Sequence, residues 1–335
     1  MFSVPAESKN QTFQEIVFMK FERLHYLKSI LYREPAFILK YYLHKKAENI
    51  SVDYVYMADG KMIHGGLFDR LKGMASIYAL SMVQGKKFGI YFKEPFLLEK
   101  YLVPRSYDWR VSESDMIYSY PQSRPIIAYS EHDQPKRVIR KRDGQIHFYY
   151  GSNILDYINK QYETEYEWTA LFNELFKPSP YLEEQIYKIR ERQENKYIAF
   201  HLRFLNLLGD KVEKLAYPEM DADRKEHLIN DCIDKIKVLS RANNDCKIFV
   251  CSDSMIFIDR IKDQMPEVMI VKGNPKHLDN VAVISDADSL KLFLDIYMLV
   301  GAEKVFSIVG KGLYSSAFPD YAAKIGGCPF ARVSL

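Results

Sequence analysis

The chain has 335 residues, of which 47 are basic and 44 are acidic. This length exceeds that of one ordinary hydrophobic core and predicts two domains of ~100–200 residues each. The nearly balanced charge leaves no large field that would attract nucleic acid, so we expect no nucleic-acid partner.

Cysteines and apolar segments indicate the compartment. The four cysteines have neither the CxxC spacing of a metal site nor the density of a disulfide framework, which indicates thiols in a reducing compartment. Residues 1–10 are polar and do not resemble a signal peptide. The longest apolar segment, residues 290–300, is interrupted by Lys291 and Asp295 and is shorter than the ~20 residues of a membrane span. The sequence therefore predicts a cytoplasmic protein.

The N-terminal region is basic and aromatic. Residues 13–46 have apolar side chains near helical spacing and predict helix, with a break at Pro35. A basic amphipathic helix can associate peripherally with the inner face of a membrane, whereas an ordinary solvated helix face is the commoner alternative.

A strand, a turn and a helix follow. Residues 51–57 alternate like a strand, and a polar turn leads to a helix over residues 67–82 with one apolar stripe. Residues 87–92 resemble the next strand, which favours a parallel βαβ arrangement.

The middle of the chain gives weaker signals. Residues 94–150 show no clear pattern, and residues 154–176 and 181–192 predict helices on either side of a proline-rich break. The domain boundary fits best close to this break, giving an N-terminal domain over residues 1–190 and a C-terminal domain over residues 191–335.

The second half alternates short apolar strands with helices, which predicts an α/β fold with a doubly wound parallel sheet. The predicted strands cover residues 197–202, 247–251, 268–271 and 304–309. The predicted helices cover residues 224–241, 256–264, 289–301 and 316–325.

His201 and Arg203 lie at the end of the strand predicted over residues 197–202. Because side chains alternate along a strand, both leave the same face at its carboxyl end, where open α/β sheets bind ligands. An arginine fork beside an imidazole suits phosphate, so the pair indicates a nucleotide or nucleotide-sugar site. The alternative for His201 alone is a packing role.

Two further strand ends carry polar and glycine residues. These residues are Ser252, Asp253, Lys311, Gly312, Ser315 and Ser316. Glycine permits close approach of the backbone, and hydroxyls and amides at a helix start favour an anion. Each residue has a simpler alternative, because Asp253 and the serines can cap helices and Lys311 can point to solvent. Their convergence with Arg203 at one sheet edge favours a binding site.

A glycine turn in the first half adds a fourth candidate. Gly65 and Gly66 place backbone amides near a ligand, and Asp69 and Arg70 follow in the first helical turn. The alternative is a tight strand-to-helix connection in which Asp69 complements the helix dipole.

Together these segments resemble the GDP-fucose-dependent GT-B glycosyltransferases, which include α1,2- and α1,6-fucosyltransferases and protein O-fucosyltransferases. Residues 65–73 resemble the glycine turn of their first domain, and His201-Leu202-Arg203 resembles their His-x-Arg motif. Residues 307–327 resemble their serine-rich C-terminal turn. Many members continue the His-x-Arg motif with a second arginine and an acid, whereas this chain has Phe204 and Asn206.

The resemblance implies a GT-B fold, in which two Rossmann-like domains with parallel sheets face a central cleft. It implies that Arg203 binds the GDP pyrophosphate, with His201 beside it near donor or acceptor. It places Asp253 near the guanine or ribose and Ser315 and Ser316 on the phosphates.

We therefore expect an inverting, metal-independent glycosyltransferase that moves fucose from GDP-fucose to a glycan of a surface polysaccharide, as in bacterial members. Arg203 would stabilise the leaving GDP, and Asp69 is the first candidate for general base, ahead of His201. We expect neither a cofactor nor a metal. The alternatives are transfer of another GDP-sugar, such as a heptose or deoxy-sugar, or a non-catalytic nucleotide- or glycan-binding subunit of a polysaccharide assembly complex.

Overall fold

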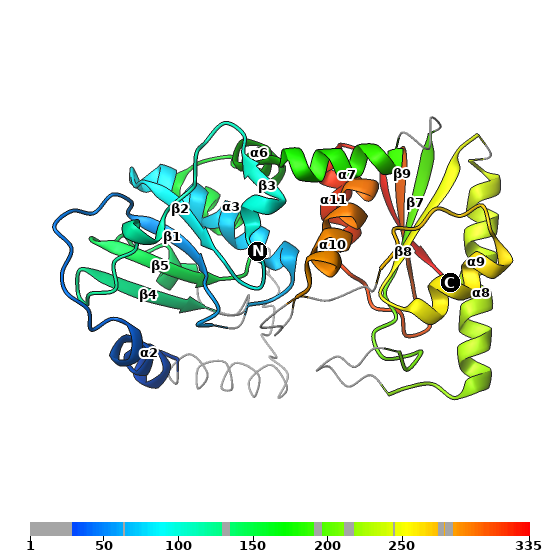
Figure 1. The fold of residues 1–335 in the computed structure, drawn as a ribbon, viewed down its shortest axis with the longest axis horizontal. Helices are drawn as coiled ribbons and strands as arrows, with labels where there is room; N and C mark the ends of the chain where they lie inside the picture. The colour runs from blue at the N-terminus through cyan, green and yellow to red at the C-terminus, as the bar shows by residue number, and fades with distance from the viewer. Residues whose placement is uncertain are drawn as a thin grey trace, which may run out of the picture.

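Figure 1 shows a computed structural model of the chain, in which two α/β domains lie side by side along the long axis. The structure describes residues 29–62, 64–128, 135–190, 196–210, 218–243, 245–273, 278 and 284–335. The part of the predicted N-terminal helix before residue 29 lies outside these residues.

The first domain is built on a sheet of four parallel strands in the order β2-β1-β5-β4. The strands are β1 (Tyr54–Ala58), β2 (Phe88–Phe92), β4 (Ser123–Ala128) and β5 (Gln145–Tyr150). Every residue of β1 and β5 is buried, since both faces of the sheet are covered.

Helices α3 (Leu67–Gln84), α5 (Leu155–Tyr162) and α6 (Trp168–Leu175) cover one face of this sheet. Helix α2 (Glu34–Tyr41) packs Phe37 on the other face, against Tyr149 of β5. The π-helical turn η1 (Ser29–Arg33) precedes α2. Pro35 lies in the first turn of α2, where a backbone N–H makes no hydrogen bond within the helix. The break predicted at Pro35 is therefore the change from the π-helical turn η1 to the α-helix α2.

Short elements complete the first domain and lead to the second. They are η2 (Leu98–Lys100), β3 (Leu102–Pro104), η3 (Glu113–Asp115), α4 (Pro135–Val138), β6 (Phe176–Pro178) and α7 (Pro180–Arg190). Strands β3 and β6 pair in antiparallel orientation. The predicted boundary after residue 190 falls at the end of α7, and α7 itself contacts α10 of the second domain.

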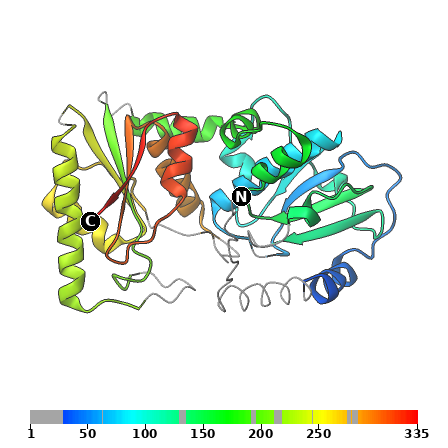
Figure 2. The same cartoon turned by 180° about the vertical axis from the view of Figure 1, so that it is seen from behind.

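The second domain has four parallel strands in the order β10-β9-β7-β8. They are β7 (Tyr197–Leu202), β8 (Lys247–Ser252), β9 (Lys304–Val309) and β10 (Phe330–Ser334). Helices α8 (Ala222–Arg241) and α9 (Met255–Gln264) lie on the outer face. Helices α10 (Asp286–Val300) and α11 (Phe318–Gly326) lie on the inner face, between this sheet and the first domain, as Figure 2 shows from behind.

Strand parity determines which side chains face the first domain. In β7, Ile198, Phe200 and Leu202 pack in the core under α8 and α9. The alternate residues Tyr197 and Ala199 belong to a core that continues through α10 and α11 into the first domain. His201 shares their parity, so it faces the domain junction.

The predicted elements are largely confirmed, with the following differences. Strands β3, β4 and β5 lie within residues 94–150, where the sequence shows no clear pattern, and the helix predicted over residues 13–46 ends at Tyr41. Residues 268–271 make one bridge, between Phe249 and Met269, rather than the predicted strand. Residues 154–176 form two helices, α5 and α6, instead of one. Strand β10 was not predicted, because its alternating residues are only partly buried and give a weak apolar signal. None of the described helices combines the length and apolar character needed to cross a membrane.

Candidate functional site

Three strand ends of the second domain lie at one level of the sheet. Leu202 of β7 is in register with Ser252 of β8 on one side and with Ile308 of β9 on the other. Arg203 and Asp253 follow directly. The structure therefore brings together the segments that the sequence pattern singled out.

Arg203 is held by the segment between β9 and α11. Its carbonyl oxygen accepts the N–H of Tyr314 at 2.8 Å, and its guanidinium lies 5.0 Å from the centroid of the Tyr314 ring. This cation–π contact orients the planar guanidinium. Arg203 is half-buried, and Ser315 next to Tyr314 is exposed.

Asp253 shapes the loop that follows Arg203. Its two carboxylate oxygens accept the N–H groups of Phe204 at 2.7 Å and Leu205 at 2.9 Å. Leu205 has a φ of 53°, a left-handed conformation that is costly for leucine without such support. Ser254 caps α9, since its Oγ accepts the N–H of Phe257. The alternative role of Asp253 as the cap of this helix is therefore wrong.

The turn after β9 has an unusual backbone. Gly310, Lys311 and Gly312 have φ angles of 99°, 50° and 95°, all in the left-handed range. Lys311 Nζ lies 2.6 Å from Asp231 Oδ2 on α8, so the lysine is directed along the outer helix. Ser316 is buried, and its Oγ accepts the N–H of Phe318 at the start of α11, which is the capping role considered for it.

Arg70 fastens the glycine turn of the first domain. It is buried, and it donates to the carbonyl oxygens of Gly65, Glu94 and Leu278. Leu278 belongs to the second domain, so the bond to its carbonyl oxygen links the two domains. Gly66 is the N-cap residue of α3.

Phe318 connects this turn to the end of β7. Its ring centroid lies 5.3 Å from that of Phe68 on α3 and 5.4 Å from that of His201, on which it stacks. Tyr321, one turn further along α11, contacts Phe68 and Trp168. His201 is therefore packed against a ring of the domain junction, in agreement with the packing alternative for this residue.

Asp69 lies beside this aromatic contact. Its carboxylate is half-exposed and pairs with Lys72 Nζ at 2.8 Å. Lys72 Nζ also lies over the Tyr321 ring at 5.3 Å. A Cβ atom at Gly65 would lie 2.8 Å from Asp69 Oδ2, so glycine at this position leaves room for the carboxylate.

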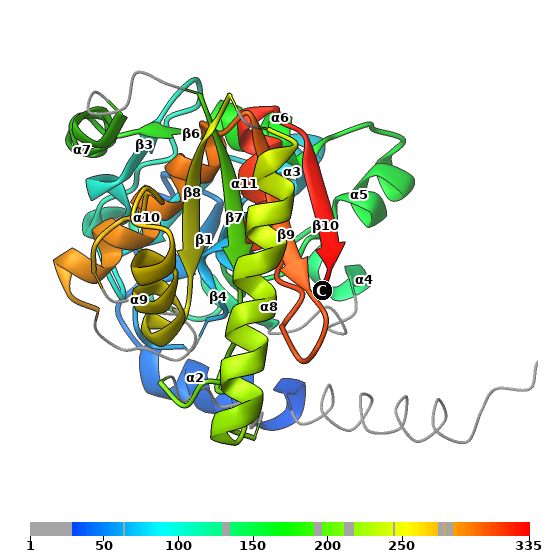
Figure 3. The ribbon, with the colours of Figure 1, turned by 90° about the vertical axis from the view of Figure 1, so that its right-hand side faces the viewer.

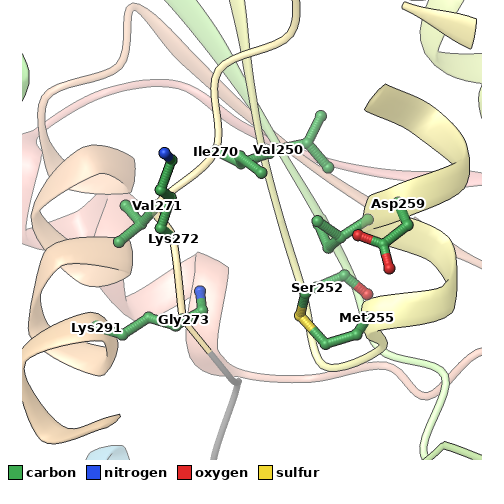
Figure 4. Close-up of a pocket in the computed structure, with 10 residues that line it drawn as sticks. Val250, Ser252, Met255, Asp259, Ile270, Val271, Lys272, Gly273 and Lys291 are labelled. Carbon is green, nitrogen blue, oxygen red and sulfur yellow. The ribbon is translucent and has the colours of Figure 1, made fainter. Parts of the chain in front are cut away.

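A cavity of about 270 Å³ opens at the end of β8, between α9 and α10 (Figure 4). Its lining includes Ser252, Asp259, Lys272 and Lys291 together with apolar side chains. Lys291 Nζ pairs with Asp295 Oδ2 at 2.7 Å inside α10. Figure 4 shows Lys291 reaching from α10 toward Gly273 at the cavity wall.

Asp295 is a buried acid that the sequence interpretation treated only as an interruption of an apolar run. Its Oδ1 has no hydrogen-bond partner among the described residues. Burial raises its pKa, and Lys291 opposes this rise. Two opposite charges four residues apart in an apolar helix were the available sequence signal for this pair.

No group of three or more His, Cys, Asp or Glu side chains within the described ranges could hold a metal ion. The site is thus built from cations, hydroxyls, carboxylates and backbone amides.

The architecture is that of the GT-B fold, with two domains that each contain a parallel sheet, and the predicted fold class is confirmed. The fold is similar to that of the α-1,6-fucosyltransferase NodZ soaked with GDP-fucose, with a TM-score of 0.52 and 15% identity over 82% of this chain and 93% of that chain. A selenomethionine structure of the fucosyltransferase NodZ from Bradyrhizobium also has a TM-score of 0.52. Its identity is 13%, over 81% of this chain and 91% of that chain.

POFUT1 in complex with GDP covers 85% of this chain and 99% of its own, at 10% identity and a TM-score of 0.45. No protein-family model matches the sequence, and no curated protein matches it. At identities this low, the similarity to NodZ shows the fold alone, and this fold is fucosyltransferase-like.

Proposed function

We propose that this protein is an inverting, metal-independent glycosyltransferase that uses a GDP-sugar, with GDP-fucose as the first candidate donor and a surface glycan as acceptor. The observation that carries the proposal is the position of Arg203. Its guanidinium is oriented by Tyr314 at the sheet edge, one strand from the cavity at β8. NodZ, which has the same fold, was crystallised with GDP and soaked with GDP-fucose.

Arg203 would bind the diphosphate of the donor. Departure of GDP leaves negative charge on the β-phosphate, and a fixed guanidinium stabilises that charge more in the transition state than in the ground state. Tyr314 bonds to the backbone of Arg203, and this brings the next residue, the exposed Ser315, and the start of α11 close to Arg203. Both would add hydrogen-bond donors for the diphosphate.

Asp69 would accept the proton of the acceptor hydroxyl while the oxygen of that hydroxyl attacks the anomeric carbon of the donor sugar. Its carboxylate is half-exposed, and the ion pair with Lys72 orients it. His201 is stacked on Phe318 and would position the reacting groups rather than act first as base.

The cavity at β8 would hold the nucleoside. Its size suits part of a ligand that extends toward Arg203, and its wall combines apolar side chains with Ser252, Lys272 and Lys291.

The remaining predicted residues support this geometry. Asp253 holds the backbone beside Arg203, Arg70 holds the glycine turn, and Lys311 is engaged by Asp231. Gly65 leaves room for Asp69, and Gly312 permits the turn before Tyr314.

The test compares Arg203→Ala with Lys311→Ala, which removes a cation from the neighbouring turn. We expect Arg203→Ala to lower kcat/KM for fucose transfer from GDP-fucose by about 10²–10³-fold with an unchanged unfolding temperature. Lys311→Ala should stay within about threefold of the wild type, since its partner Asp231 lies on the outer helix. Equal activity of Arg203→Ala and wild type would disprove the role of Arg203, and failure of the wild type to bind GDP would disprove the function.

A further inference from the structure

Helix α2 and the residues that flank it expose apolar side chains at the edge of the first domain. Leu31, Tyr32, Leu39 and Leu43 are 72%, 70%, 68% and 68% exposed. The opposite face carries Phe37, which is buried against the sheet. Figures 1 and 3 show α2 at the lower edge of the molecule, below the sheet of the first domain. Leu39 belongs to α2, Leu31 and Tyr32 belong to η1, and Leu43 lies just after α2 in an isolated bridge with Ser119. Single exposed apolar residues are ordinary, but four within residues 31–43 mark a binding surface.

Basic side chains outnumber acidic ones around this surface. Lys40, Lys45 and Lys46 are exposed along the end of α2 and just after it, and Glu48 is the one exposed acid that follows them within residues 40–48. The acid of the helix, Glu34, is directed inward, where it pairs with Arg137 and accepts the N–H of Ile127 at 2.9 Å.

A second basic segment lies beside α2, because Arg137 belongs to α4 and touches Glu34. Around Arg137, the side chains of Lys136, Arg140 and Lys141 are exposed. Two basic segments about one hundred residues apart in sequence therefore meet at the start of α2 through the Glu34–Arg137 pair.

We propose that the exposed apolar surface over residues 31–43 binds the surface of a bilayer that contains anionic lipids. The helix would lie in the interfacial plane, with Leu31, Leu39 and Leu43 among the acyl chains and the lysines on the headgroups. A helix of eight residues is too short to span, so the association is peripheral. The inference is independent of the proposed transfer reaction.

Two other occupants suit the charge less well. A second copy of the chain would bring two basic rims together, which opposes association. Residues 1–28 carry four basic side chains (Lys9, Lys20, Arg23, Lys28) and three acidic ones (Glu7, Glu15, Glu22), so they offer no acidic excess to complement the face.

The test is co-sedimentation of the full chain with vesicles of phosphatidylcholine alone or with about one-third phosphatidylglycerol. We expect binding to the anionic vesicles only, weakened by salt. The variant Leu31→Ser/Leu39→Ser/Leu43→Ser should reduce binding about tenfold or more, and Lys40→Glu/Lys45→Glu/Lys46→Glu should abolish it.

The matched control is Tyr187→Ser/Val238→Ser, which removes apolar side chains that are 61% and 58% exposed on other helices. It should bind vesicles like the wild type, and circular dichroism should show the same helix content for all variants. Unchanged vesicle binding by the triple serine variant would overturn the proposal. A dimer that this variant converts to monomer, without vesicle binding by the wild type, would assign the face to a second copy instead.

Discussion

His64 lies buried in the turn before α3, between the rings of Tyr56 and Tyr149. Its Nε2 has no hydrogen-bond partner among the described residues, and burial followed by the nearby charge of Arg70 lowers its pKa to about 3. The imidazole is therefore neutral at physiological pH, which keeps a second positive charge away from Arg70.

This pKa predicts how stability depends on pH. The unfolded chain binds a proton near pH 6.5, whereas the folded chain binds it only near pH 3, so stability is lost as pH falls through this window. Between pH 7 and pH 5 we expect the wild type to lose about 2 kcal/mol of unfolding free energy relative to His64→Gln. Urea denaturation of both proteins at the two pH values measures the difference, and parallel pH profiles would contradict the assigned shift.

At the scale of elements, the turn from β9 to α11 determines where Tyr314 and Arg203 meet. Gly312 has a φ of 95°, and a Cβ there would lie 3.2 Å from Leu207 Cδ1. We expect Gly312→Ala to cost about 1–3 kcal/mol of stability and to weaken GDP binding about tenfold, because the turn must shift. Gly85→Ala is the control, since Gly85 has a φ of 62° with no atom near its missing Cβ.

Gly85→Ala should cost about 1 kcal/mol and leave GDP binding unchanged. Calorimetric titration with GDP and urea denaturation of both variants check these outcomes. Equal GDP affinity of Gly312→Ala and Gly85→Ala would show that the conformation of this turn does not determine GDP binding.

Most strands and helices of the second domain are predictable, because each short apolar run contrasts with a polar, periodic helix. Strand β7 and strand β9 have the predicted bounds. The partners of individual side chains were not predictable from local pattern. Phe318 joins Phe68 to His201, and Asp253 bonds to Phe204 and Leu205, across separations that only the tertiary fold defines.

At the scale of the whole molecule, the two domains share one hydrophobic core. It extends from the first sheet through α3 and α6 to α10, α11 and the inner face of the second sheet. The aromatic contacts of Phe68 with Phe318 and Tyr321 lie within this core. A continuous core makes the unfolding of one domain depend on the other, so the wild type should unfold in a single calorimetric transition.

Phe68→Ala tests this coupling against Phe200→Ala, whose ring stacks on Phe306 inside the second domain. Both variants should lose about 3–5 kcal/mol, since both rings are buried. Only Phe68→Ala removes contacts between the domains, so only this variant should split the transition into two and raise KM for the donor by loosening the junction beside Arg203. A single transition in Phe68→Ala would show that the domains are coupled elsewhere, most directly through the bond of Arg70 to Leu278. Two transitions in Phe200→Ala would show that the split does not depend on contacts between the domains.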